Sequence, residues 1–563
     1  MNRPRRTVRE TTETNRDWKR TSYLDLHCTK EVLMHPNTKA PLEELLVSGG
    51  DNRLNLLGGE RLNKYGCGPQ PRSVVPFGSC TSSSTSLRGY AKAMRTLRIL
   101  QGQDDFDTAV AQCAQSIRTR LAELLELNAD VDIALAPSGT DVEFLAVALA
   151  GGNSKKQIVN IVVGPGEVGS GTPLAAGCCH YDNQTPNGRS KTRGTPIDAE
   201  LASRVTVKTV DIRGAGGRQL EESEINAEVT QLVVDSSNDD TVVLLHIVAH
   251  SKTGVFAPSF ACVERLRAAF PDLVVVIDAA QGRISRAGLR DALDRGYLVI
   301  FTGSKFYGGP PFSGALLIPH TFDETIQSLG QLPQGFGDYF SAAEMPERWT
   351  AIRNALPKKS NLGIVLRWTA ALAEIDAYYA VPELTRDWVL NCFETQAPQI
   401  LGASSVFKLL PTTPAPHDEE VDRPLEARTT VVGFWITPPG ERNALEKTDL
   451  ARLHHNLNRD ISLLYPDWDT EVTSQCFHIG QPVNLGTAGY ILRVAIGGEL
   501  VVRVATDARL GRTFDQRLTW LQQQIMNLRR KVECLVGVEA DADSVIFNPG
   551  VELPLKLPAA NLK

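Results

Sequence analysis

The sequence has no long apolar run, no secretion signal and no block of one charge sign. None of its apolar stretches approaches the about 18 residues that a membrane-spanning helix needs. The opening segment, MNRPRRTVRETTETNRDWKR, lacks the apolar centre of a signal peptide. The formal net charge is −6, and the short RPRR cluster is too small a basic patch for nucleic acid. We therefore expect a soluble, cytoplasmic protein that binds neither membranes nor nucleic acids.

Paired cysteine motifs are also absent. The 10 cysteines include no C-x-x-C spacing, so the sequence indicates free thiols rather than a disulfide framework or a zinc site. The run Cys178-Cys179-His180 places metal-ligating residue types side by side. Adjacent side chains rarely chelate one ion, however, and no second ligand pair accompanies them. We expect no metal site.

The sequence does contain a regular alternation of apolar runs and helical segments. With 563 residues, the chain is long enough for two or three domains around a large core. From about residue 109, runs rich in Val and Ile recur, most of them separated widely enough for crossovers: VDIALAP, IVNIVVG, VTVKTVDI, VVLLHIVA, LVVVIDAA and YLVIFTG. This pattern predicts an α/β fold with a mostly parallel, mixed sheet covered by helices on both faces. GALLIP follows too closely for a crossover helix, so we expect it to be the antiparallel strand.

Three regions are predicted along the chain. Residues 1–108 form an N-terminal extension and a segment at the substrate mouth, residues 109–400 a large domain, and residues 401–563 a smaller C-terminal α/β domain. In the last region, TTVVGFWITP and YILRVAIGG are predicted strands, and helices are predicted near Ala444–Asn456 and at the closing RTFDQRLTWLQQQIMNLRRKVECL. The Pro-rich, acidic segment Pro411–Glu426 is a predicted surface loop.

Polar residues follow several predicted strands, at the edge where open α/β sheets bind ligands. Ser138-Gly139-Thr140 lies between a strand and a helix. The unpaired N–H groups of a helix N-terminus bind anions, although the same residues also suit an ordinary N-cap. Asp278 ends a wholly apolar strand, where a carboxylate needs a cationic or hydrogen-bonding partner; the alternative is an Asp that caps a turn.

One lysine, Lys305, ends another apolar strand among small residues, in FTGSKFYGGPPFSGALLIP. An ammonium group is costly to bury, so either it reaches solvent or its nitrogen takes part in chemistry. An anion-binding helix terminus, an Asp and a strand-end Lys together suit pyridoxal 5′-phosphate (PLP). The lysine forms a Schiff base with its aldehyde, the aspartate pairs with the pyridinium nitrogen, and the helix terminus binds the phosphate. We therefore expect PLP as the cofactor.

The motif order SGT, IDAAQ, TGSK, GG, SGALL, LRVAIG resembles the fold-type I PLP-dependent enzymes. Within them it is similar to the class V aminotransferase and cysteine desulfurase group, over roughly residues 113–535. The resemblance implies an aspartate aminotransferase-like large domain that binds PLP. It also implies an enzyme that forms an external aldimine with an amino acid or amine, and a homodimer with its active site at the interface.

The resemblance also implies roles for single residues. Lys305 would form the internal aldimine and move the Cα proton, Asp278 would pair with the ring nitrogen, and Gln281 would bind the phenolic oxygen. Arg493, in LRVAIG, would bind the substrate α-carboxylate through its planar guanidinium; the alternative is an ordinary strand arginine. The remaining positions that match the cofactor and substrate site are Ser138, Gly139, Thr140, Thr302 and Ser304 at the phosphate, and His250 or Ser251 near the ring.

Two positions depart from the family pattern, and a third matches a contact that the family makes across the subunit interface. The family often stacks a histidine on the ring, but the matching segment here reads VVGPGEVGSGTPLAAG, with Glu167 and Val168 in the neighbourhood. Many relatives also have His where this chain has Ser304. In KKSNLG, Ser360 or Asn361 matches a phosphate contact that the family takes from the partner subunit.

The sequence leaves the reaction open. We expect an aminotransferase-like reaction first. The alternative reaction is desulfurase-like C–S cleavage, with Cys476 as the sulfur acceptor and His478 beside it. The alternative for Cys476 itself is an ordinary loop cysteine. A catalytically inactive scaffold of the same fold is the alternative from another class. The loop GSCTSSSTS matches the family's substrate mouth, and neither it nor GPGEVGSGT fits a nucleotide-binding motif.

Overall fold

The computed structural model describes residues 40–538, except 60, 79–82 and 412–429. The chain's contacts divide it into Met1–His35 and Pro36–Lys563, and every described residue belongs to the second unit. The RPRR cluster, most of the predicted 411–426 loop and part of GSCTSSSTS lie outside the described residues.

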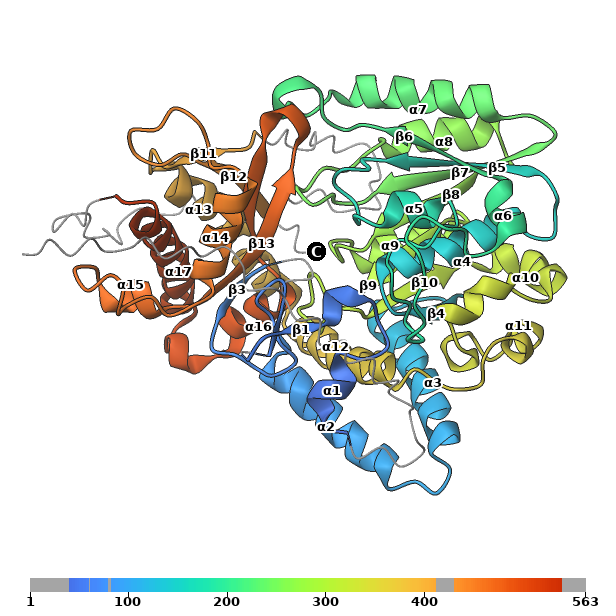
Figure 1. The fold of residues 1–563 in the computed structure, drawn as a ribbon, viewed down its shortest axis with the longest axis horizontal. Helices are drawn as coiled ribbons and strands as arrows, with labels where there is room; N and C mark the ends of the chain where they lie inside the picture. Colours follow the sequence, from blue (N-terminus) through green and yellow to red (C-terminus); the bar gives the residue numbers. More distant parts are fainter. Residues whose placement is uncertain (1–39, 60, 79–82, 412–429, 539–563) are drawn as a thin grey trace, which may run out of the picture. The chain divides into compact units, whose positions relative to one another are not determined.

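The larger α/β part of this unit is built on a seven-stranded mixed sheet (Figure 1). Its strands all pair in parallel except β10, which is antiparallel to both of its neighbours. This confirms the predicted α/β class and the antiparallel role of GALLIP. In order across the sheet the strands are β4 (Asp132–Ala136), β10 (Gly314–Ile318), β9 (Leu298–Thr302), β8 (Val274–Ala279), β7 (Thr241–Val248), β5 (Gln157–Val163) and β6 (Val205–Val210).

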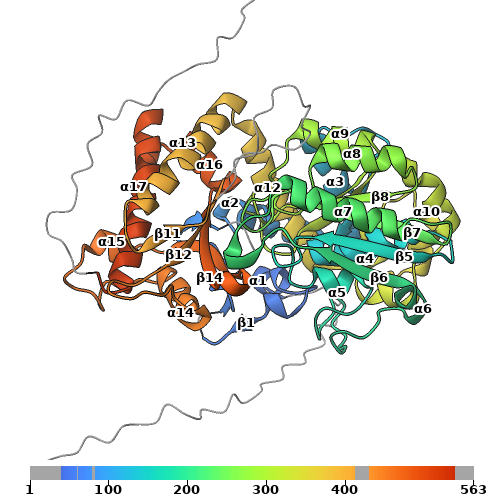
Figure 2. The same cartoon turned by 90° about the horizontal axis from the view of Figure 1, so that it is seen from above.

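Helices cover both faces of this sheet (Figure 2). One side carries α7 (Glu222–Ser236), α8 (Phe260–Ala269) and α9 (Arg286–Asp294), and the other carries α4 (Gly139–Gly151) and α5 (Thr172–Ala176). Helix α4 is buried nearly all round, and its apolar side chains share one core with alternate residues of β7, β8, β9 and β10. Because a parallel sheet is buried on both faces, its strands are continuous apolar runs, which is why the sequence identified them.

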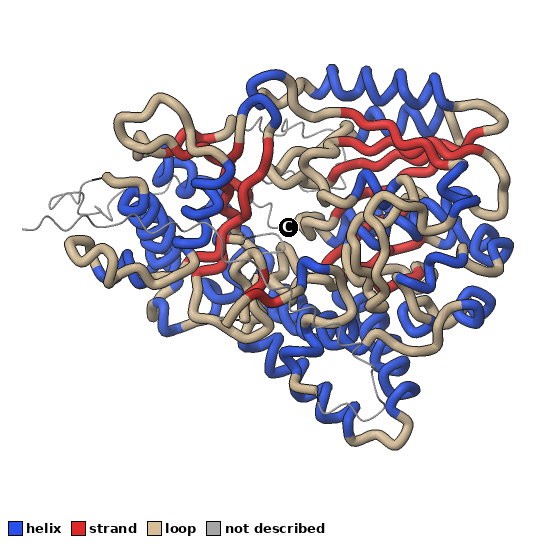
Figure 3. The backbone as a smooth tube through the Cα atoms, viewed as in Figure 1, coloured by secondary structure: helices blue, strands red, loops and turns tan. Residues whose placement is uncertain are grey.

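A second, five-stranded sheet lies apart from the first (Figure 3). Its order is β11 (Phe407–Leu409), β12 (Val431–Ile436), β14 (Tyr490–Ala495), β13 (Phe477–Asn484) and β3 (Val75–Phe77). The helices of this region are α13 (Glu383–Gly402), α14 (Lys447–Leu457), α15 (Thr470–Ser474), α16 (Gly498–Thr506) and α17 (Phe514–Leu535). The predicted smaller α/β region is thus present, and it contains three strands that the sequence did not predict, β11, β13 and β3.

The residues before the first large-sheet strand are held by contacts with the rest of the unit. They form α1 (Leu42–Leu46), the short 3-10 helix η1 (Asn52–Leu54), and the long helices α2 (Leu87–Gln101) and α3 (Phe106–Leu125). Arg367, fully buried on α12 (Leu362–Ala380), donates to the backbone carbonyls of Ser48, Gly49 and Phe312. The N-terminal segment therefore packs beside the loop that follows Lys305.

Candidate active site

The polar residues at the strand ends converge on one cavity of about 540 Å³. Its wall includes Lys305, Asp278 and Arg493, which come from two different sheets. The other predicted residues that line it are Ser138, Gly139, Thr140, His250, Gln281, Thr302 and Ser304. The structure therefore brings together all of the predicted site residues except Ser251 and Cys476.

The N-terminus of α4 forms one end of this cavity. Ser138 is the N-cap: its Oγ accepts a hydrogen bond from Asp141 N (3.3 Å) and donates one to Asp141 Oδ2 (2.7 Å). The hydroxyl of Tyr181 donates to Asp141 Oδ1 (2.5 Å). The following N–H groups, of Gly139 and Thr140, belong to the first turn and have no intrahelical acceptor. This arrangement suits an anion, because the unpaired donors and the helix dipole act together.

Asp278 lies at the end of β8 and Lys305 follows the neighbouring strand β9, at the same edge of the sheet. Asp278 is the fifth residue of β8, half-buried, and its Oδ1 accepts a hydrogen bond from Ala280 N (3.0 Å). Lys305 lies three residues beyond β9 in a tight loop, closed by the bonds from Gly303 N to Ser313 O (2.9 Å) and from Gly309 N to Gly303 O (3.0 Å). The loop requires glycine at position 303, since a Cβ there would lie 2.7 Å from the Cβ of Ala371.

A buried acid and an imidazole lie below Asp278, and the sequence analysis did not identify them. His246 pairs with Val276 in the sheet, so it shares the α4 face with Asp278. Its Nε2 is 3.3 Å from Oε2 of Glu143 on α4, and both side chains are almost fully buried. Burial lowers the pKa of His246 to about 3, while burial and then the charge of Asp278 raise the pKa of Glu143 well above its usual range. Burial thus favours the uncharged form of both side chains.

His250 and Ser251 have different surroundings. His250 lines the cavity and has a left-handed backbone (φ 59°). Ser251 is buried behind the wall, where its Oγ donates to Glu167 Oε2 (2.6 Å). Glu167 also forms an ion pair with Arg213. Ser251 thus orients Glu167, and the predicted contact between Ser251 and the ring has no support in this geometry.

Arg493 faces the cavity from the second sheet. It lies on β14, is almost fully buried, and its Nη1 donates to Gln481 O (3.4 Å). Gly480 of β13 leaves the space that this side chain occupies, because a Cβ there would lie 2.5 Å from Arg493 Cγ. The guanidinium is thus held in a narrow channel and directed at the same cavity as Lys305.

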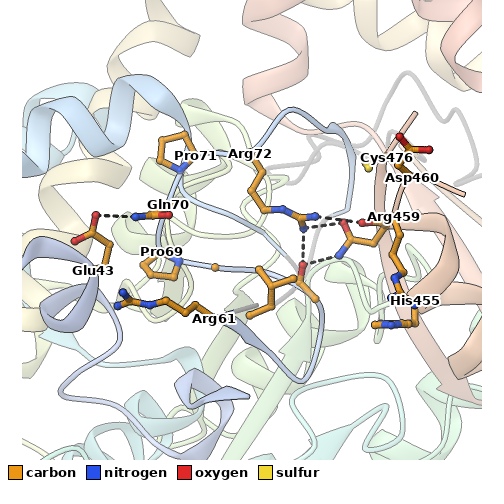
Figure 4. Close-up of a pocket in the computed structure, with 14 residues that line it drawn as sticks. Glu43, Arg61, Pro69, Gln70, Pro71, Arg72, His455, Arg459, Asp460 and Cys476 are labelled. Atoms are coloured by element: carbon orange, nitrogen blue, oxygen red, sulfur yellow. Dashed lines mark hydrogen bonds between the residues drawn. The ribbon is translucent and has the colours of Figure 1, made fainter. Parts of the chain in front are cut away.

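Cys476 lies elsewhere. It lines a separate pocket of about 450 Å³ with Arg72, His455 and Arg459 (Figure 4). Next to that pocket the buried Lys531 donates to Arg459 O (2.6 Å) and to Gln475 O (2.5 Å). The thiol therefore has no place in the wall of the Lys305 cavity.

His478 is buried as well, and its Nε2 is 3.2 Å from Arg72 Nη1. Burial, and then the charge of Arg72, lower the pKa of His478 to about 3. A neutral imidazole that accepts from an arginine is a structural partner, and it does not act as an acid beside Cys476.

The remaining predictions fall on structural contacts. Asn361 is the N-cap of α12, since its Oδ1 accepts from Ile364 N (3.2 Å) and its Nδ2 donates to Gly49 O (3.0 Å). Of the two residues that match the contact to a neighbouring subunit, Asn361 is thus engaged within its own chain, and the match of Ser360 stays a prediction. The imidazole Nδ1 of His180 hydrogen-bonds the Tyr339 hydroxyl (2.7 Å), and within the described ranges no group of three or more His, Cys, Asp or Glu is arranged to hold a metal.

No protein-family model matches the sequence, and no curated protein matches it. Solved structures do resemble the chain. A cysteine desulfurase from Thermococcus onnurineus NA1 is 14% identical over 81% of this chain and 95% of its own, with a TM-score of 0.46. A phosphoserine aminotransferase from Cytophaga hutchinsonii is 11% identical over 78% of this chain and 98% of its own, also with a TM-score of 0.46.

A third similar structure is a ureidoglycine–glyoxylate aminotransferase from Bacillus subtilis. It is 14% identical over 78% of this chain and 89% of its own, with a TM-score of 0.41. At such identities the likeness concerns the path of the chain and leaves substrate and activity open. No described helix is long and apolar enough to cross a membrane.

Proposed function

We propose that this protein is a PLP-dependent enzyme that acts on an amino acid or amine in an aminotransferase-like reaction. The observation that supports this most directly is the convergence of Lys305, Asp278, the α4 N-terminus and Arg493 on one cavity. These groups come from distant parts of the chain and from two sheets, so their convergence is a property of the fold. A cavity of about 540 Å³ is also within the usual range for a cofactor with a small substrate.

The donor set of the cavity fits PLP. The first turn of α4, with the hydroxyls of Thr140 and Ser304, suits a phosphate dianion, whereas the hydroxyl of Thr302 already donates to Ala280 O (2.7 Å). Asp278 suits the N–H of a pyridinium ring, and Gln281 can donate to a phenolate oxygen. Lys305 supplies the primary amine that an aldehyde requires.

When bound, PLP supplies an electron sink that stabilises negative charge at a substrate carbon. The chain's own residues then divide the remaining work. Lys305 holds or moves the proton at the substrate Cα, Asp278 fixes the ring by its nitrogen, and Arg493 orients the substrate by its α-carboxylate.

Transamination is favoured over C–S cleavage by the position of Cys476. A sulfur-accepting thiol has to reach the reacting substrate, and Cys476 lines the other pocket. With an amino-acid donor and a 2-oxo acid acceptor, amino-group exchange should therefore persist in Cys476→Ser. Release of sulfide from cysteine that depends on Cys476 would reverse this preference. The homodimer implied by the resemblance remains a prediction, tested by sedimentation of the full chain.

The cofactor assignment is tested by chemical trapping. Purified protein is incubated with PLP, reduced with borohydride, digested and analysed by mass spectrometry. We expect the pyridoxyl mass on Lys305, no stable modification in Lys305→Ala, and unchanged labelling of Lys305 in Lys252→Ala. Lys252 is the matched control because it lines the same cavity. Labelling of Lys252 instead, or no specific labelling, would contradict the assignment and favour an inactive scaffold.

A further inference from the structure

An arginine that the sequence analysis did not single out lies beside the α4 N-terminus. Arg53 belongs to the short helix η1, and it lines the same cavity as Lys305. Its Nη2 is 3.4 Å from Oγ of Ser138, the N-cap of α4. The N-terminal segment thus brings a permanent positive charge to the end of the cavity where the anion-binding donors lie.

The guanidinium of Arg53 is held on three sides. Asp51, which is almost fully buried, accepts from its Nε (2.9 Å) and from its Nη2 (2.5 Å). The Phe312 ring lies below it, with the centroid 4.7 Å from Arg53 Cζ, and the Tyr181 ring is at 5.7 Å. The side chain is only 17% exposed. An arginine fixed in this way loses little rotamer freedom when it binds a further group.

Donors remain after these contacts are made. A guanidinium carries five N–H groups, and Asp51 takes the edge formed by Nε and Nη2. No hydrogen bond or ion pair joins Nη1 to the described part of the chain. If the Asp51–Arg53 pair served only to fix η1, the backbone cap from Arg53 N to Asp51 Oδ1 (2.9 Å) would suffice without a guanidinium in the cavity wall.

We propose that Arg53 binds the phosphate group of the cofactor, together with the first turn of α4. This inference rests on the proposed function. The charge of Arg53 is balanced by Asp51, so the gain comes from directed N–H donors rather than from net charge. Hydrogen bonds to charged groups contribute enough that losing one should weaken binding roughly 10- to 100-fold.

The test compares PLP with pyridoxal, which lacks the phosphate. Apo-protein is titrated with each ligand by absorbance, for wild type and for Arg53→Met. We expect the Kd for PLP to rise roughly 10- to 100-fold, while the Kd for pyridoxal changes less than about 3-fold. Inorganic phosphate should compete with PLP in the wild type and far less in the variant. Arg72→Met is the matched control, because Arg72 is a half-buried arginine of the same segment that lines the other pocket.

Removing Arg53 alone also leaves the Asp51 carboxylate unpaired. The double variant Asp51→Asn/Arg53→Met separates the effect of this unpaired charge from the loss of the Arg53 donors. The proposal predicts that this neutral double variant still binds PLP weakly. Wild-type affinity in the double variant would overturn it, because the loss in Arg53→Met would then come from the unpaired charge of the buried Asp51.

Equal losses for PLP and pyridoxal, or no loss for either, would also overturn the proposal. If Arg53→Met proves unstable, Arg53→Lys keeps the charge without the fork and should still weaken PLP more than pyridoxal. A wild type that binds no PLP would instead refute the proposed function itself.

Discussion

Asp141 should bind a proton near neutral pH, and this is testable in the folded protein. The carboxyl is completely buried at the start of α4, where it accepts hydrogen bonds from the hydroxyls of Ser138 and Tyr181. Burial, opposed by these two hydrogen bonds, raises its pKa from 3.8 to about 6. The substitution Asp141→Asn keeps the shape of the side chain and removes this titration.

The magnitude follows from linkage. Because the folded pKa lies above the unfolded one, Asp141 favours folding fully below pH 3.8, and this contribution is lost as the pH rises to about 6. A pKa displaced from 3.8 to about 6, at about 1.36 kcal/mol for each pH unit, corresponds to about 3 kcal/mol. Because the unfolded state already titrates partly below pH 4, the free energy of unfolding of Asp141→Asn minus that of wild type should increase by about 2.4 kcal/mol between pH 4 and pH 7. Effects of the substitution that do not depend on pH cancel in this comparison.

Two assays measure the effect. A potentiometric difference titration of folded wild type against Asp141→Asn should show one additional proton released by the wild type, with a midpoint near pH 6. Urea unfolding of both proteins at several pH values then gives the stability difference. Identical titration curves between pH 4.5 and 7.5, with a stability difference that does not change with pH, would refute the reasoning, since Asp141 would then be ionised despite its burial.

Three further substitutions test the fold and the site. Gly303→Ala places a Cβ 2.7 Å from that of Ala371, so it should lower the free energy of unfolding by about 1–3 kcal/mol and lower the Tm. Adding Ala371→Gly should restore much of this loss, and the same Tm for wild type, single and double variant would argue against the contact. Burial, and then the nearby Glu374, raise the pKa of Glu499 from 4.5 to about 8, so Glu499→Gln should gain stability over wild type as the pH rises from 4.5, by about 3 kcal/mol at pH 7; a gain that is flat with pH would contradict this. Arg493→Met should raise the KM for an amino acid about 10- to 100-fold and leave the KM for an amine without a carboxylate unchanged, whereas equal effects on both would remove its carboxylate role.

Much of the large sheet could be predicted because burial on both faces makes each strand a continuous apolar run. Strand β13 was missed for a local reason. Gly480 and Pro482 interrupt its pattern, and its pairing with β14 shifts register between Gly480 and Val483. Strand β3 is only three residues long, and it pairs with β13 about four hundred positions later in the chain. Pairing between such distant segments leaves no periodic signal in a short run.

The site shows the same difference between local patterns and long-range contacts. Lys305, Asp278 and Ser138 could be predicted because each lies at or just beyond the end of a strand, and parallel strands end at one edge of a sheet. Arg53 could not, since η1 reaches the cavity only through long-range contacts, including those of Arg367 with the backbone at Ser48 and Gly49. The pocket that Cys476 lines could not be predicted, because its position in the order of motifs carries no information on which cavity its thiol faces.

The two halves of the candidate site are joined directly, which bears on how it works. Gly498 N donates to Phe306 O (2.5 Å), one residue after Lys305. Arg283, five residues after Asp278, donates to Ile496 O (2.8 Å) and to Thr430 Oγ1 (2.7 Å). The bonds that involve Gly498 and Ile496 reach the residues just after β14, the strand that carries Arg493, so this strand is tied to the loops that follow Lys305 and Asp278. Since orientation contributes strongly to rate only when reacting groups are held in register, these main-chain and arginine contacts would, under the proposed function, hold residues from two separate sheets in position around one small substrate.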